Sequence, residues 1–110
     1  MSVAEDVSYV RQLGRLSEQD VAKATGTGRS TVGAWMRGTR RPTGVRLERF
    51  AELSALVERL ARVMDPEYLP IWLHKPVPAL GDDKPLEVLA RGDYRQLSAL
   101  VAELESPGAA

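Results

Sequence analysis

The sequence predicts an all-α fold. Apolar residues recur at intervals of three and four along most of the chain, which is the spacing of one helix face. No segment shows the sustained alternation of a strand, and glycine and proline separate the periodic segments. With 44% hydrophobic and 27% charged residues, the 110-residue chain has the composition of a globular domain.

Three short helices are expected in the first half, over residues 5–14, 17–24 and 28–38. Ser17 is the expected N-cap of the second helix, since its hydroxyl can accept from a free backbone N–H. Thr27 or Gly28 is expected to cap the third helix, which should end at Gly38.

Residues 16–42 have the pattern of a helix-turn-helix. Ala22 is small where the two helices would cross, and Gly26 falls in the turn, where a positive φ suits glycine. Val32 would fix the second helix onto the first. The rest of the shared core is expected from Leu16, Val21 and Trp35. The sequence therefore predicts a DNA-binding helix pair.

The second half predicts a long helix over residues 45–64, whose wide apolar stripe, Leu47 included, suits a spine between two halves. A short helix is expected to start at Asp65-Pro66, with Asp65 as its N-cap. After a loop over 74–83, Asp82 or Asp83 should cap a helix that contains Pro85. The last helix is expected over 94–105, with Asp93 and Gln96 as a capping box, before a flexible tail over 106–110.

The third helix should enter the major groove of DNA. Its expected outward positions are Gly28, Arg29, Ser30, Gly33, Ala34 and Arg37. Arg29 could contact guanine, and Ser30 or Thr31 a base edge or phosphate. Arg37, Arg40 and Arg41 are expected to hold the DNA backbone. A solvated arginine-rich helix face is the alternative. A dimer is expected, because one helix-turn-helix binds DNA weakly.

Charge divides the chain although its net charge is zero. Residues 1–50 contain nine Lys or Arg and five Asp or Glu, whereas residues 51–110 contain six and ten. A basic half beside an acidic half indicates two kinds of partner, of which one is polyanionic.

Catalytic, metal-binding and membrane functions are not expected. The chain has no cysteine and a single histidine, His74, so neither a thiolate metal site nor a histidine cluster can form. No phosphate-binding loop or dinucleotide fingerprint is present, so no cofactor is expected. The absence of a signal peptide and of a long apolar run predicts a cytoplasmic protein.

Residues 72–104 resemble the toxin-binding domain of the Xre/MbcA/ParS antitoxins, whose members carry a helix-turn-helix ahead of it. Nine residues fall in the order of that family: Trp72, Leu73, Pro76, Leu80, Gly81, Lys84, Pro85, Leu86 and Leu89. The pair His74-Lys75 stands where Pro-Asn often occurs. The resemblance covers nearly the whole chain.

The resemblance implies a bacterial antitoxin that occludes the active site of a RES-domain, NAD⁺-consuming toxin and represses its own operon. It also implies a homodimer within a larger toxin–antitoxin assembly. Candidate toxin contacts are Trp72, Lys84, Pro85, Arg91, Tyr94, Arg95, Glu103 and Glu105. Trp72, Leu80, Leu86 and Leu89 could instead be core residues.

The predicted organisation has three parts: a helix-turn-helix region (1–44), a connecting helix (45–65) and a toxin-binding helical domain (66–110). The alternative function is a stand-alone transcriptional regulator whose C-terminal helices dimerise or bind a ligand.

Overall fold

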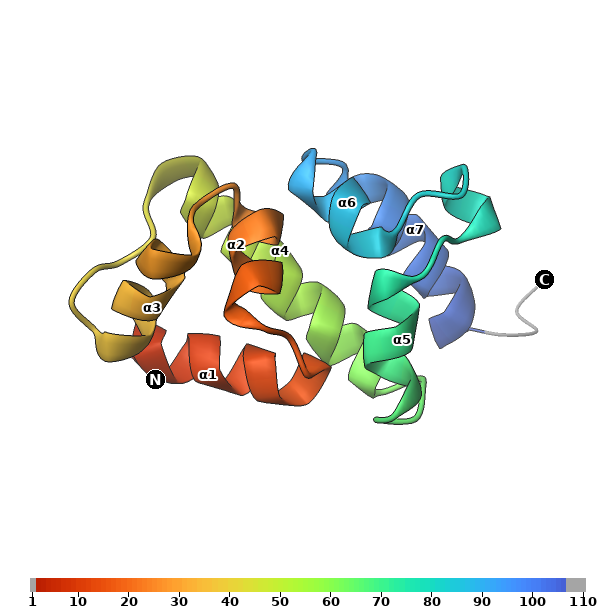
Figure 1. The fold of residues 1–110 in the computed structure, drawn as a ribbon. Coiled ribbons are helices and arrows are strands. Elements are labelled where there is room, and N and C mark those ends of the chain that lie inside the picture. Colours follow the sequence, from red (N-terminus) through yellow and green to blue (C-terminus); the bar gives the residue numbers. More distant parts are fainter. Residues whose placement is uncertain (1, 107–110) are drawn as a thin grey trace.

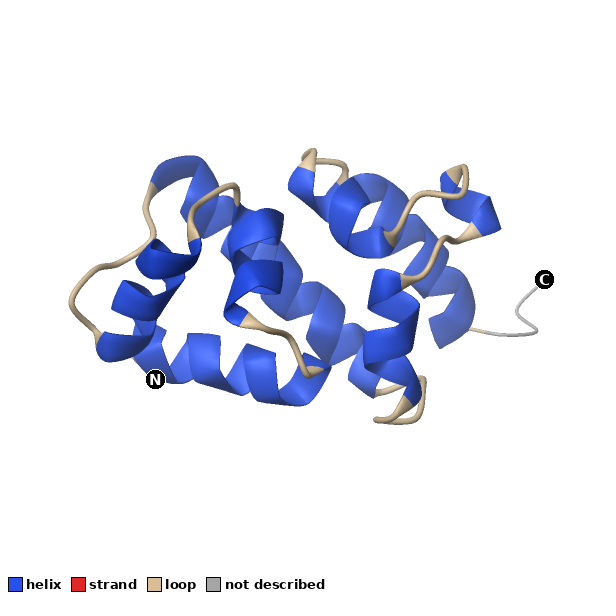
Figure 2. Cartoon of the chain, in the orientation of Figure 1, coloured by secondary structure: helices blue, strands red, loops and turns tan. Residues whose placement is uncertain are grey.

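A computed structural model describes residues 2–106, and within them the fold is all-helical (Figures 1 and 2). The elements in order are α1 (Val3–Gly14), α2 (Glu18–Thr25), α3 (Arg29–Arg37), α4 (Gly44–Ala61), α5 (Tyr68–His74), the 3₁₀ turn η1 (Pro78–Leu80), α6 (Pro85–Ala90) and α7 (Tyr94–Glu105). The only strand-like pairing in this range is an isolated bridge between Val77 and Asp83. The all-α prediction is confirmed. Residues 107–110 of the predicted flexible tail lie outside the described residues.

Helix α4 is the spine of the molecule, as predicted. It packs against α1 and α2 on the N-terminal side and against α6 and α7 on the C-terminal side (Figure 1). The result is elongated, with principal extents of 47 × 24 × 21 Å. One continuous core runs through both ends, from Val7 to Val101.

The apolar stripe of α4 differs from the prediction at its start. Phe50, Leu53, Leu56, Val57 and Leu60 are buried, but Leu47 is 48% exposed and Val45 is 62% exposed. Because no other helix covers these two side chains, the first turn of α4 contributes little to the core.

Local capping predictions succeed in the first half of the chain. Ser17 caps α2, and its hydroxyl accepts from the Asp20 N–H at 3.0 Å while Asp20 accepts from the Ser17 N–H at 3.0 Å. Gly26 follows α2 with φ = 74°, which glycine adopts at least cost. Gly28 is the N-cap of α3.

Capping predictions fail in the second half. The N-cap of α6 is Lys84, not Asp82 or Asp83, because Asp82 lies in a left-handed turn (φ = 66°). Asp93 precedes α7 but makes no side-chain cap, since its backbone (φ −103°, ψ 51°) is not in the extended conformation typical of an N-cap.

The start of α5 was also placed too early. Its N-cap is Glu67, and Asp65 instead accepts through its backbone carbonyl from the N–H groups of Tyr68 and Leu69. A turn after α4 therefore separates Asp65-Pro66 from α5.

The two halves meet along α2, which packs against α3 and α4 and also against α6. Polar contacts follow the same seam: Lys23 lies 3.8 Å from Glu87, and His74 Nε2 lies 3.1 Å from Asp20 Oδ1. The helix-turn-helix thus shares its first helix with the C-terminal unit.

Candidate functional site

Helix α3 is held with one face inward. Val32 and Trp35 are buried, and Trp35 meets Phe50 of α4 edge-on, with ring centroids 6.4 Å apart. Gly38 ends the helix in the left-handed conformation. The opposite face is therefore free for a partner.

That outward face carries the predicted polar residues. Arg29, Ser30 and Arg37 are exposed, and Thr31 is half-buried. Arg40 and Arg41 are exposed in the loop before α4. The four arginines among them form no ion pair with any residue in the range 2–106. An unpaired cluster of guanidinium groups is an electrostatic footprint for a polyanion.

The prediction that Gly33 and Ala34 face outward is wrong, because both are buried. A Cβ placed on Gly33 would lie 3.2 Å from Arg37 Nη1 and 3.5 Å from Glu18 Oε2. These two side chains therefore cover the middle of α3. The residues left to read bases are at its N-terminal turn.

Arg46 was missed by the sequence analysis. It is exposed in the uncovered first turn of α4. With Thr31, Arg40 and Arg41 it lines a cleft of about 250 Å³ between α3 and α4. Arg46 lies four residues after Pro42, at the start of the predicted long helix, and this position could have indicated that its side chain is exposed.

The candidate toxin contacts do not form one cluster. Trp72 and Pro85 are buried and belong to the core. Lys84, Arg91 and Arg95 are exposed, Tyr94 is half-buried, and Glu103 is exposed near the end of α7. Leu80, Leu86 and Leu89 are buried, so the core interpretation of those leucines is confirmed.

Tyr94 and Arg95 share a groove on α7. The groove has a volume of about 620 Å³ and is lined by Glu52, Gly92, Tyr94, Arg95, Ser98, Ala99 and Ala102. Small side chains at Ser98, Ala99 and Ala102 leave room for a partner to approach the helix closely.

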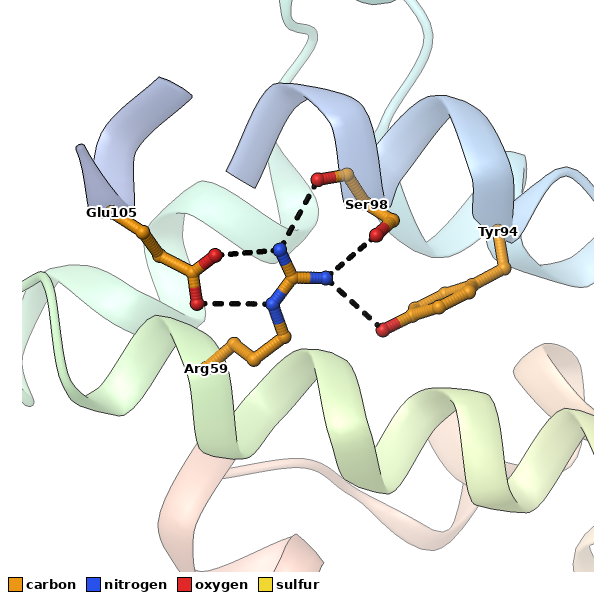
Figure 3. Close-up of polar contacts among 4 residues, drawn as sticks. All are labelled: Arg59, Tyr94, Ser98 and Glu105. Carbon is orange, nitrogen blue, oxygen red and sulfur yellow. Dashed lines mark hydrogen bonds and ion pairs between the residues drawn. The ribbon is translucent and has the colours of Figure 1, made fainter. Parts of the chain in front are cut away.

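Arg59 joins α4 to α7 through five contacts (Figure 3). Its Nε and Nη2 donate to the Glu105 carboxylate at 3.0 and 2.6 Å. Nη1 donates to the Ser98 hydroxyl at 2.7 Å and to the Tyr94 hydroxyl at 3.4 Å, and Nη2 donates to the Ser98 carbonyl at 3.2 Å. These contacts use the full donor capacity of a guanidinium.

The charges in this cluster stabilise each other. The hydrogen bond to Glu105 raises the pKa of Arg59, and the same bond lowers the pKa of the Glu105 carboxyl group. Glu105, a candidate toxin contact, is thus exposed but already paired with Arg59 of the same chain. Sequence reasoning missed Arg59, because 46 residues separate it from Glu105.

His74 is more than a surface residue. Its Nδ1 lies 2.7 Å from the Pro70 carbonyl oxygen and its Nε2 lies 3.1 Å from the Asp20 carboxylate. Partial burial alone would lower the pKa of His74, but these two acceptors outweigh it and raise the pKa. For Asp20, partial burial works toward a higher pKa, but hydrogen bonds from Ser17 and His74 make the net shift downward.

Residues 2–106 contain no group of three or more acidic, histidine or cysteine side chains arranged to hold a metal ion. Within the same range, no helix combines the length and apolarity needed to cross a bilayer.

Comparison with known proteins follows the same division of the chain. A helix-turn-helix family model matches residues 7–53, which include α2, the turn and α3. Residues 7–53 are a helix-turn-helix domain.

Similarity to known antitoxins extends beyond that domain. The "Mycobacterial cidal antitoxin MbcA" of Mycobacterium tuberculosis (strain H37Rv) is 25% identical over 92 residues, which are 84% of this chain and 80% of that protein. The MbcA of Mycobacterium bovis matches to the same extent. The chain is therefore similar to MbcA well beyond its helix-turn-helix domain.

A solved structure has the same fold. In the crystal structure of the M. tuberculosis MbcT–MbcA toxin–antitoxin complex, one chain superposes with a TM-score of 0.81 at 24% identity. The match covers 92% of this chain and 91% of that chain. The arrangement of the seven α-helices in residues 2–106 is therefore that of a known fold.

Proposed function

We propose that this chain is the antitoxin of a toxin–antitoxin pair, which binds a protein toxin through its C-terminal unit and DNA through its helix-turn-helix. One observation carries the proposal: the similarity to MbcA includes both halves, not the helix-turn-helix alone. A regulator that shares only a DNA-binding domain with antitoxins would lose the match after residue 53.

The DNA role rests on α3 and the loop after it. Arg29 and Ser30 occupy the N-terminal turn of α3, from which side chains reach base edges in the major groove. Arg37, Arg40 and Arg41 provide positive charge for the phosphates. The DNA is proposed to be the operator of the chain's own operon, which the protein represses.

The toxin role rests on α7. Its groove presents Tyr94 and Arg95, and Tyr and Arg are the residue types that contribute most to many interfaces. The toxin is proposed to be a RES-domain enzyme that consumes NAD⁺, with the end of α7 placed over its pocket. Lys84, Arg91 and Glu103 lie outside this groove, so Tyr94 and Arg95 are the stronger candidates for the first contact.

Co-expression with the product of the adjacent reading frame tests the proposal. We expect the two proteins to co-purify, and we expect this chain to prevent the NAD⁺ depletion that the partner causes. The Arg95→Glu variant should no longer prevent that depletion. Arg15→Glu is the matched control, since Arg15 is exposed after α1 and lies outside the proposed toxin-binding surface. A chain that binds DNA but no neighbouring protein would be a stand-alone regulator.

The end of α7 can be tested by truncation. Removal of residues 103–110 should restore toxin activity, but it also removes Glu105 from Arg59. Arg59→Gln in the full chain separates the two effects, because it disrupts the ion pair and leaves residues 103–110 unchanged. Full inhibition by the truncated chain would contradict occlusion of the pocket by this segment.

The proposed homodimer has its own test. Light scattering of the toxin–antitoxin complex measures its mass, and hence how many copies of this chain it contains.

A further inference from the structure

A second basic cleft lies on the seam between the two halves. It has a volume of about 390 Å³ and is lined by Thr25, Gly26, Thr43, Val45, Arg46, Arg49, Ala90 and Arg91. Three of these side chains are arginines and none is acidic. Arg46 and Arg49 come from α4, whereas Arg91 follows α6 in the C-terminal unit.

The three guanidinium groups have donors to spare. Arg46 makes no hydrogen bond or ion pair with the side chains of residues 2–106. Arg49 contacts Glu52 at 3.2 Å and Arg91 contacts Asp83 at 2.7 Å, each through Nη1 only. A guanidinium has five N–H donors, so four of those on Arg49 and four of those on Arg91 form no hydrogen bond with side chains of residues 2–106. The Arg49 side chain is 21% exposed, so Arg46 and Arg91 have the more accessible donors. The Arg91–Asp83 pair is also solvent-exposed, and such pairs are weak.

Gly92 gives Arg49 its place in the cleft. Gly92 has φ = 90°, and the Arg49 guanidinium occupies the space in which a Cβ of residue 92 would stand. The turn between α6 and α7 is thus shaped around an arginine of α4. This packing joins the basic side chains of the two halves at one surface.

The seam cleft continues into the cleft beside the recognition helix. Thr43 and Arg46 line both of them. Together the clefts form a basic track, which we define as Arg40, Arg41, Arg46, Arg49 and Arg91. It begins beside Thr31 of α3 and ends in the C-terminal unit.

We propose that the basic track binds the phosphodiester backbone of the DNA that α3 reads, so that Arg91 of the C-terminal unit is a DNA-backbone residue. This inference rests on the proposed DNA binding and extends it past the helix-turn-helix. Guanidinium groups suit phosphate oxygens because their planar donors bind two oxygens at once. Arg91, predicted to contact the toxin, is then assigned to DNA.

Salt dependence of DNA binding tests the track. Fluorescence anisotropy with a duplex about three helical turns long measures the dissociation constant over a KCl series. The slope of log K against log salt is negative, and each lost phosphate contact reduces its magnitude by about 0.9. Arg46→Ala and Arg91→Ala should each show that drop. Arg62→Ala, at the far end of the same helix as Arg46, should keep the wild-type slope.

The outcomes separate this inference from the proposed function. Slopes unchanged in Arg91→Ala but reduced in Arg40→Ala would overturn the track and leave DNA binding intact. No DNA binding by the wild type would overturn both, while toxin neutralisation could still be measured. The basic track could instead bind a free phosphate compound, and calorimetric titration with inorganic pyrophosphate tests this alternative. Binding of pyrophosphate that Arg91→Ala abolishes, with unchanged DNA slopes, would overturn the assignment to DNA.

Discussion

The guanidinium of Arg59 and the carboxylate of Glu105 form a two-pronged ion pair between the spine helix and the last helix, with N–O distances of 2.6 and 3.0 Å. The same guanidinium also donates to Ser98 on α7 (Figure 3). The end of α7, where the proposed toxin-facing segment begins, therefore has a fixed position on the molecule.

Arg59→Ala should destabilise the chain, because it removes the donors that satisfy the Ser98 carbonyl and the Tyr94 hydroxyl. Loss of such charged hydrogen bonds is expected to lower the free energy of unfolding by about 1–3 kcal/mol. Urea denaturation followed by circular dichroism measures this change in the free energy of unfolding. Glu105→Gln should cost less, since Arg59 keeps its bonds to Ser98. Equal stability of Arg59→Ala and wild type would show that the cluster does not stabilise α7.

His74 should make stability depend on pH. Both of its ring nitrogens face acceptors, and only the imidazolium, which carries a hydrogen on each nitrogen, can donate to both. Asp20 favours that charge, while nearby Lys84 opposes it. Because the folded-state pKa is raised above 6.5, the stabilisation is fully present below pH 6.5 and is lost as the pH rises through the folded value.

Thermal unfolding of wild type and His74→Gln across that range measures the effect. The difference in Tm should be largest at about pH 5.5 and should shrink toward about pH 8.5. The lowered pKa of Asp20 acts in the other direction: its contribution is present above 3.8 and is lost as the pH falls through the folded value. A difference in Tm that is constant with pH would contradict the imidazolium.

Arg29→Ala and Arg40→Ala should affect DNA binding differently. Arg29 lies at the first position of α3, so its loss should erode discrimination between sites, by about 1–3 kcal/mol. Arg40 lies in the loop after α3, and its loss should weaken binding to all sequences and reduce the salt slope by about one. Competition between specific and mixed-sequence duplexes measures both. Equal effects of the two changes would argue against this division.

Trp72 should behave as a core residue. It is 7% exposed, so Trp72→Phe is expected to lower the free energy of unfolding by about 1–3 kcal/mol through a partly filled cavity. Toxin affinity of the remaining folded protein should be unchanged. Calorimetric titration with toxin, at a temperature below the unfolding transition of the variant, measures this affinity. A large loss of affinity in a stable Trp72→Phe variant would place the indole at the interface.

Local signals in the sequence predicted local structure well. Ser17 and Asp20 lie three residues apart, and both halves of their capping interaction form. Asp93 and Gln96 have the same spacing, yet no such box forms, because the Asp93 backbone (φ −103°, ψ 51°) is not extended. The backbone conformation of the residue before the helix decides whether a capping box forms. The spacing of the two residues in the sequence does not reveal that conformation.

The candidate sites were less predictable, because contacts between distant residues decide them. Helical register placed Gly33 outward, but the side chains of Arg37 and Glu18 cover it. Arg59 finds Glu105 and Arg49 meets Gly92 only once α7 and α6 pack on the spine. Such pairs have no signature in a single sequence.

The two-sided packing of α2 bears on how such proteins can diversify. One side of α2 supports the recognition helix and another supports α6, so the helix belongs to both halves at once. A new DNA specificity can arise by changes at the N-terminal turn of α3, where Arg29 and Ser30 are exposed. Exchange of the whole N-terminal segment between relatives would separate Lys23 from Glu87 and Asp20 from His74. Recombination should therefore preserve the two halves as one inherited block, while point substitutions in α3 retune the operator.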